Sequence, residues 1–177
     1  ITGLTTIGFA VKDAASNPVT TGVTVTPVAE TPAGSGTYKA ALSGTQAGVY
    51  TVVPQNGGVD VGTPGQKVTL TAGTTPSGTN STVSASKAGI TADGVDSLTV
   101  TFEAKDANNN PIPGIASEIT FKVVDGNNNP APDEAVTVSP VMETTPSGTY
   151  TATVTGTGAG DYRIIPEYNG TPVDSNL

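Results

Sequence analysis

Residues 136–170 read VTVSPVMETTPSGTYTATVTGTGAGDYRIIPEYNG, and this stretch decides the fold because the chain contains it twice. The earlier copy, residues 23–58, reads VTVTPVAETPAGSGTYKAALSGTQAGVYTVVPQNGG, with one extra residue in the turn before Tyr38. After that turn the register holds, so that Tyr38 matches Tyr150 and Tyr50 matches Tyr162. A unit repeated at a spacing of roughly 112 residues predicts a tandem array of domains.

The composition indicates a folded all-β chain. Hydrophobic residues make up 35% of the sequence and aromatic residues only 5%, so each core must be small. The 22 Gly and 14 Pro are numerous, but they stay below the level expected of disordered low-complexity chains. Many threonines alternate with apolar residues, a pattern that favours strands over disorder.

The charge balance excludes several kinds of partner. Seven Lys and Arg face 15 Asp and Glu, for a net charge of -8. Because the basic residues do not cluster, we expect no nucleic-acid partner and no adhesion to an anionic membrane face. The absence of cysteine excludes disulfides and thiolate metal sites. No apolar run reaches the length of a membrane helix and no signal peptide is present, so any targeting or anchoring segment is expected outside these residues.

Apolar residues recur at a period of two along most of the expected strands. In the clearest case Leu98, Val100, Phe102 and Ala104 share one face, with polar residues between them. Turn signals separate such strands at short spacing, and no segment has a helical period. The pattern predicts tandem immunoglobulin-like β-sandwich domains, with Tyr50 and Tyr162 at the position of a corner tyrosine.

Comparison of the two copies predicts the domain limits. We expect an immunoglobulin-like domain over residues 1–74 that lacks its first strands, a linker at 75–80, and a second domain over 81–177 whose last strand is truncated. In this register residues 1–4 match 112–115 and Phe9 matches Phe121. A rival register pairs FAVKDAASNP with FEAKDANNNP, but it needs a deletion of about twenty residues. The incomplete ends indicate either a fragment of a longer array or strands supplied by a neighbouring chain.

A longer motif at the start of the second domain resembles a known family. The run SKAGITADGVDSLTVTFEAKDANNNPIPG is similar to the opening of the bacterial immunoglobulin-like (Big_1-type) repeats of the intimin and invasin adhesins. The matching residues are Ala92, Asp93, Gly94, Asp96, Ser97, Lys105, Asp106, Asn108, Asn110, Pro111, Pro113 and Gly114. The match covers most of residues 81–177 and less of the first domain.

The resemblance implies a cell-surface protein anchored in a Gram-negative outer membrane by a segment outside these residues. Within such rods most repeats act as spacers, and the distal end contacts the host. The partners implied are neighbouring immunoglobulin-like repeats and a host-cell surface protein or extracellular matrix, with the isolated chain monomeric. The cysteine-containing lectin-like module that ends some family members has no counterpart here.

Two Asp-Asn turns, DANNNP at 106–111 and DGNNNP at 125–130, are candidate sites. Their oxygen atoms could ligate calcium, and a variant of this idea uses Asp93 and Asp96 between the domains. Asn and Asp also bond their own backbone in tight turns, and the spacing of a calcium loop is absent. We therefore interpret them as turns, and we predict no metal site and no cofactor.

Three residues remain as possible contacts with a partner, namely Tyr168, Asn127 and Asn128. Tyr168 stands where the first copy has Asn56, whereas the four matched tyrosines are expected in the cores. The matched Glu30 and Glu143 are expected at strand ends. We predict no catalytic residue and no enzyme, because histidine and cysteine are absent and no carboxylate pair is brought together by the sequence.

Together these features predict a stalk or spacer segment of a bacterial surface adhesin. The alternatives are a receptor- or matrix-binding module that acts through loops of the second domain, and an accessory domain of a secreted enzyme. The last of these rests on fold alone.

Overall fold

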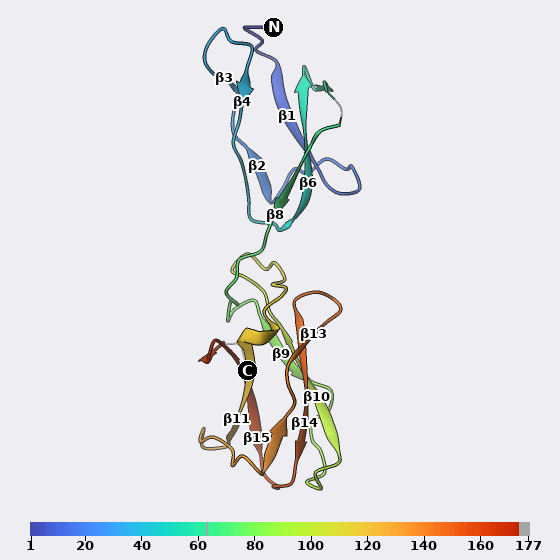
Figure 1. Ribbon diagram of the computed structural model, residues 1–177, viewed down its shortest axis with the longest axis vertical. Helices are drawn as coiled ribbons and strands as arrows, with labels where there is room; N and C mark the ends of the chain where they lie inside the picture. The colour runs from blue at the N-terminus through green and yellow to red at the C-terminus, as the bar shows by residue number, and fades with distance from the viewer. Residues whose placement is uncertain (63, 174–177) are drawn as a thin grey trace. The chain divides into compact units, whose positions relative to one another are not determined.

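The computed structural model describes residues 1–62 and 64–173. The chain divides into two compact units, Ile1–Thr71 (unit 1) and Ala72–Leu177 (unit 2). Figure 1 shows that both are built almost entirely from strands; among the described residues the single helical element is a 3-10 turn, η1, Ala116–Glu118. No helix in the described ranges is long and apolar enough to cross a membrane.

Unit 2 is a sandwich of two antiparallel sheets. One sheet has the order β12-β14-β10-β9, with β13 also paired to β14, and the other has the order β11-β15-β16. The strands are β9 (Thr82–Ala85), β10 (Ser97–Glu103), β11 (Ile119–Asp125), β12 (Val136–Val138), β13 (Met142–Thr144), β14 (Thr149–Gly156), β15 (Tyr162–Tyr168) and β16 (Thr171–Pro172). The prediction of an all-β immunoglobulin-like sandwich is confirmed.

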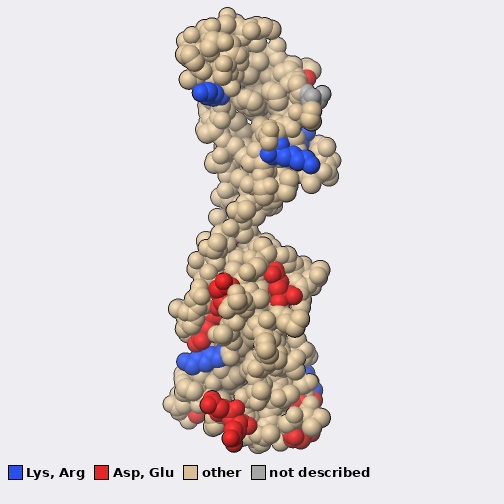
Figure 2. Space-filling view, in the orientation of Figure 1, with Lys and Arg blue, Asp and Glu red and all other residues tan. Residues whose placement is uncertain are grey.

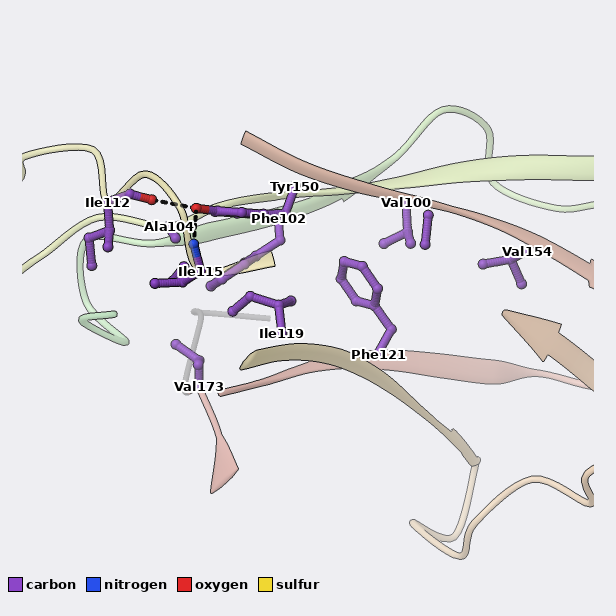
Figure 3. Packing of buried hydrophobic residues seen from close by; sticks show 11 residues of the cluster. Val100, Phe102, Ala104, Ile112, Ile115, Ile119, Phe121, Tyr150, Val154 and Val173 are labelled. Atoms are coloured by element: carbon purple, nitrogen blue, oxygen red, sulfur yellow. Dashed lines mark hydrogen bonds between the residues drawn. The ribbon is translucent and has the colours of Figure 1, made fainter. Parts of the chain in front are cut away.

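The core of unit 2 is filled by alternate residues of the facing strands. Val100 and Phe102 of β10 lie in it with Tyr150 and Val154 of β14 and Phe121 of β11. Figure 3 shows these side chains between the two sheets. The predicted inward face of residues 98–104 is thus confirmed, and Phe102 and Ala104 are 0% exposed.

Unit 1 repeats part of this architecture. Its strands are β1 (Ile7–Lys12), β2 (Val23–Val25), β3 (Ala29–Glu30), β4 (Tyr38–Lys39), β5 (Leu42–Gly44), β6 (Gly48–Asn56), β7 (Val59–Asp60) and β8 (Gln66–Leu70). The strand β6 pairs with β1 on one side, and with β7 and β8 on the other. The pairs β2–β5 and β3–β4 form the opposite face.

Strand pairing decides between the two registers. Phe9 of β1 lies opposite Pro54, and Phe121 of β11 lies opposite Pro166. The strand β10, which the rival register would equate with β1, pairs with β14 and β9 instead. The register that matches Phe9 with Phe121 is therefore correct.

The core of unit 1 is much smaller than that of unit 2. Among residues 1–62 and 64–71, its cluster contains three buried residues, Val11, Val23 and Tyr50, with Leu42 and Leu70 packed against them. Among the described strands of unit 1, none takes the place that β10 has beside β14. A cavity of about 740 Å³ lies open beside Phe9, Val11 and Val23.

The segment expected as a linker is bonded to unit 2. Pro76 is buried, and the N–H of Ser77 donates to the carbonyl oxygen of Lys105 at 2.7 Å. The side chain of Asn80 donates to the carbonyl of Asp106 at 2.8 Å. The domain limits at 74 and 81 stay predictions, and residues 76–80 pack as part of unit 2.

Candidate functional site

Three turns with the pattern Asp-x-x-x-Asn-Pro share one geometry, and we call them the Asp turns. They start at Asp13, Asp106 and Asp125. In each, one carboxylate oxygen accepts the N–H groups two and four residues later, at 2.8–2.9 Å. The fourth residue of each turn has a positive φ, between 64° and 67°, a conformation that Asn tolerates better than most residues.

The second oxygen of each Asp is also occupied. It accepts the side-chain amide of the Asn four residues later, as Asn110 donates to Asp106 at 2.9 Å. A carboxylate whose lone pairs already meet N–H donors offers little to a cation. The described residues hold no group of three or more acidic side chains that could bind a metal ion. These contacts support the interpretation of the Asn-rich segments as turns.

Asp106 differs from its two counterparts because it is buried, with 5% exposure. Burial alone would raise the pKa of this carboxyl, but hydrogen bonds from Asn110, Gly73 and Asn108 outweigh it and lower the pKa to about 2. Asp13 and Asp125 are half-buried, and their pKa is also lowered, chiefly by the backbone N–H groups of Asn17 and Asn129.

Asp106 also forms a hydrogen bond with the first residues of unit 2. Its Oδ2 accepts the N–H of Gly73 at 2.8 Å. The contact spans 33 positions in the sequence, so the turn pattern alone could not reveal it. Asp106 thus joins the turn at 106–111 to the segment that enters unit 2.

A tyrosine and a glutamate fasten the same segment in both units, and we call them the Tyr–Glu pairs. In unit 2 the Tyr150 hydroxyl donates to the Ile112 carbonyl at 2.7 Å and accepts the Ile115 N–H at 3.2 Å. Figure 3 shows both bonds. Glu143 accepts the N–H groups of Gly114 and Gly148, each at 2.9 Å.

Unit 1 contains the matching contacts. The Tyr38 hydroxyl accepts the Leu4 N–H at 2.8 Å and donates to the Ile1 carbonyl at 3.4 Å. Glu30 accepts the N–H groups of Gly36 at 2.6 Å and Gly3 at 3.2 Å. The match between residues 1–4 and 112–115 is therefore confirmed atom by atom.

The electrostatics of the Tyr–Glu pairs follow from these bonds. The Gly148 and Gly114 N–H groups lower the pKa of Glu143, and the Gly36 N–H lowers the pKa of Glu30. Burial raises the pKa of Tyr150, which keeps its hydroxyl proton available to the Ile112 carbonyl. The sequence predicted that both glutamates lie at strand ends. It did not predict their hydrogen-bond partners, because each glutamate bonds a glycine far away in the chain.

Asp93 and Asp96 also serve their own loop. Asp93 accepts the N–H groups of Val95 and Asp96 at 2.8 Å. Asp96 accepts the Thr91 N–H at 2.9 Å and forms an ion pair with Lys87 at 2.5 Å. Both carboxylates have a lowered pKa for these reasons. Their oxygens are committed to residues 87–97, where they shape the loop before β10.

The tyrosines expected in the cores divide into two groups. Tyr50 and Tyr150 are 5% and 0% exposed, and the Tyr50 hydroxyl donates to the Gln46 carbonyl at 3.0 Å, as a corner tyrosine does. Tyr38 and Tyr162 are half-buried.

The three candidate contact residues lie in different places. Tyr168 ends β15, is half-buried and packs against the core of unit 2. Asn127 and Asn128 are exposed in the Asp turn that follows β11, where Arg163 donates to Asn128. Tyr168 lies opposite Ile119 at the start of β11, so about 20 Å of strand separates it from the turn. The structure does not bring the candidates together into one surface.

Unit 2 carries the whole net charge of -8. Unit 1 carries three Lys and three Asp or Glu, whereas residues 72–177 carry four Lys or Arg and 12 Asp or Glu. Figure 2 shows the acidic side chains concentrated there. Of the acidic residues in described parts of unit 2, Asp93, Asp96, Asp106, Asp125 and Glu143 are engaged in the backbone contacts above.

The geometry defines a tandem immunoglobulin-like β-sandwich protein whose recurring polar residues fasten its own loops. Comparison with known families then places it: residues 77–176 match the family described as "Invasin, domain 3", and the chain belongs to that family.

Three solved structures are similar to this chain. FdeC, an Escherichia coli adhesin, is 31% identical with a TM-score of 0.71, over 99% of this chain and 51% of that one. Invasin, described as a bacterial integrin-binding protein, is 30% identical with a TM-score of 0.67. The match covers 94% of this chain and 30% of that one. InvD of Yersinia pseudotuberculosis is 27% identical with a TM-score of 0.61. The match covers 94% of this chain and 48% of that one. This chain therefore spans about half or less of the length of each.

Proposed function

We propose that this chain is a spacer segment of a bacterial cell-surface adhesin, which supports cell adhesion by holding a binding tip away from the envelope. One observation carries the proposal. The polar residues that recur between the units, Tyr38 with Glu30 and Tyr150 with Glu143, bond their own backbone in both. Contacts of this kind hold the loops of each unit in place, which supports a structural role for the recurring residues.

The similarity to FdeC and invasin supports a role in adhesion. Anchoring in a Gram-negative outer membrane through a segment outside these residues, and repeats of the Big_1 type, are parts of the same proposal. The matched proteins are adhesins, which favours this function over an accessory role in a secreted enzyme. Antiparallel strands fastened by the Tyr–Glu pairs and the Asp turns suit units that each keep a fixed form.

A replacement experiment tests the spacer role. In the adhesin that carries this chain, both units are exchanged for two unrelated immunoglobulin-like sandwiches of equal length, and a second variant deletes both units. We expect the exchanged protein to support attachment of bacteria to host cells as the original does, and the shortened protein to support less. Loss of attachment in the exchanged protein would show that this chain itself makes the contact.

A receptor- or matrix-binding module remains the second candidate. The exposure of Asn127 and Asn128 favours it, as does the integrin binding stated for the similar invasin. Saturable binding of the isolated chain to host cells, abolished by Asn127→Ala with Asn128→Gly, would establish this function. A Tyr168→Ala variant tests the third candidate residue separately, because it lies at the other end of the strands.

A further inference from the structure

The two units close the same hairpin with different residues. In unit 2 the turn between β15 and β16 is made by Asn169 and Gly170, whose φ angles are 48° and 73°, and Tyr168 pairs with Thr171 across it. Positive φ at both positions of a two-residue turn favours Asn-Gly. The equivalent turn of unit 1 has two glycines, at 57–58, with φ angles of 59° and 80°. The hairpin therefore does not require an asparagine.

Residues 169–171, Asn-Gly-Thr, have the pattern Asn-x-Ser/Thr of an acceptor sequence for N-linked glycosylation. All three residues are exposed. The backbone N–H of Asn169 donates to the Glu118 carbonyl at 2.8 Å, which holds the turn in place. Among the described residues, neither the Asn169 side-chain amide nor the Thr171 hydroxyl has a hydrogen-bond partner. The turn thus presents both reactive and recognition groups to solvent.

An acidic residue accompanies this acceptor sequence. Glu167 lies two residues before Asn169, opposite Thr120 on the outer face of the sheet. Its carboxylate accepts the Thr120 hydroxyl at 3.4 Å, in an exposed contact. Such a carboxylate can form a charge-assisted bond with a basic side chain of a transferase. Unit 1 differs at all three positions, where it has Gln55, Gly57 and Val59.

The sequence contains one other acceptor pattern, Asn-Ser-Thr at 80–82, and the fold engages it. The side-chain amide of Asn80 donates to the Asp106 carbonyl at 2.8 Å. Ser81 is 2% exposed, and its hydroxyl donates to the Lys105 carbonyl at 3.2 Å. A sugar on the Asn80 amide would displace these contacts. Only the acceptor at 169–171 is accessible in the folded chain.

We propose that Asn169 is an N-glycosylation site, with Glu167 and Thr171 as the residues that a transferase recognises beside it. The co-substrate is an oligosaccharide joined through its anomeric carbon to a lipid pyrophosphate. The Asn169 Nδ2 attacks that carbon, a carbon–nitrogen bond forms, and the carbon–oxygen bond to the pyrophosphate breaks. The lipid pyrophosphate leaves, and one amide proton passes to a base of the transferase. The site does not depend on the spacer role.

Mass spectrometry of the adhesin isolated from the bacteria that make it tests the proposal. Trypsin cleaves after Lys67, Lys87 and Arg163, so the two acceptor sequences fall in different peptides. We expect a glycan on Asn169 in the peptide that follows Arg163. The peptide that contains Asn80 should carry none, because the folded chain engages that amide.

Three variants made in the same bacteria separate recognition from folding. Thr171→Val should abolish the glycan and leave the hairpin intact, since unit 1 has a valine at this strand position. Glu167→Gln should lower the occupancy of Asn169 by about tenfold, the loss expected for one charge-assisted bond. Thr82→Val is the matched control in the other acceptor and should leave the glycan on Asn169 unchanged. Amide exchange in β11 and β15 shows that each variant stays folded.

Four results would each overturn the proposal. These are an unmodified Asn169 in the native adhesin, a glycan on Asn80 in place of Asn169, full occupancy in Thr171→Val, and full occupancy in Glu167→Gln. None of them bears on the spacer role, which is tested by exchange of both units. A glycan on Asn169 adds a bulky, hydrated group to the β15–β16 turn.

Discussion

At the scale of single residues, Tyr150 shows how one hydroxyl organises a loop. It is fully buried and bonds both ends of the segment from Ile112 to Ile115. A buried backbone group that loses its partner costs about 1–3 kcal/mol. The ring also fills the core between β10 and β11, so its packing and its hydrogen bonds can be separated by experiment.

Replacing Tyr150 with Phe keeps the ring and removes both bonds. We expect the free energy of unfolding of unit 2 to fall by about 1–3 kcal/mol, measured by chemical denaturation. Tyr38→Phe is the matched control in unit 1, where the longer 3.4 Å bond is exposed, and it should cost less. Equal losses in the two variants would mean that burial of the bonds is irrelevant.

At the scale of elements, the Asp turns show that one sequence pattern can contribute differently to the free energy of unfolding at different places. All three share the same backbone bonds, but only Asp106 is buried and also bonds Gly73. Because the pKa of Asp106 is lowered from 3.8 to about 2 in the folded state, its contribution to the free energy of unfolding is complete above about pH 5. This contribution amounts to about 2 kcal/mol and is lost as the pH falls from about 5 towards 2.

The variant Asp106→Asn tests this assignment. It should unfold more easily at neutral pH, by about 2 kcal/mol, and its stability should change less than that of the original chain between pH 4 and 2. Asp125→Asn is the control, with the same turn on an exposed loop, and should have a smaller effect. Identical acid unfolding of the original and Asp106→Asn would contradict the proposed role.

The sequence predicted those features that depend on local periodicity or on direct repetition. The alternation from Leu98 to Ala104, the register of Phe9 with Phe121 and the burial of Tyr50 and Tyr150 all follow from such patterns. The partners of Glu143 and Asp106 did not, because Gly114 and Gly73 are 29 and 33 positions away and carry no side chain to mark them.

At the scale of the whole molecule, the two units should differ in stability. Of the described residues, 11 are buried in the core cluster of unit 2 and three in that of unit 1, so far less apolar surface leaves water in unit 1. We expect two separate unfolding transitions in denaturant, with unit 1 first, and faster amide exchange in β1 and β6 than in β10 and β14. A single transition, or the reverse order of exchange, would show that the units depend on one another.

The Asp turns have a further consequence for chemical ageing. Asparagine deamidates when the following backbone nitrogen attacks its side chain and forms a cyclic imide. In these turns the nitrogens after Asn108, Asn109, Asn127 and Asn128 are held by the Asp at the start of the turn, and Asn17, Asn110 and Asn129 precede proline. We therefore expect these asparagine-rich loops to deamidate more slowly than asparagines whose following nitrogen is free.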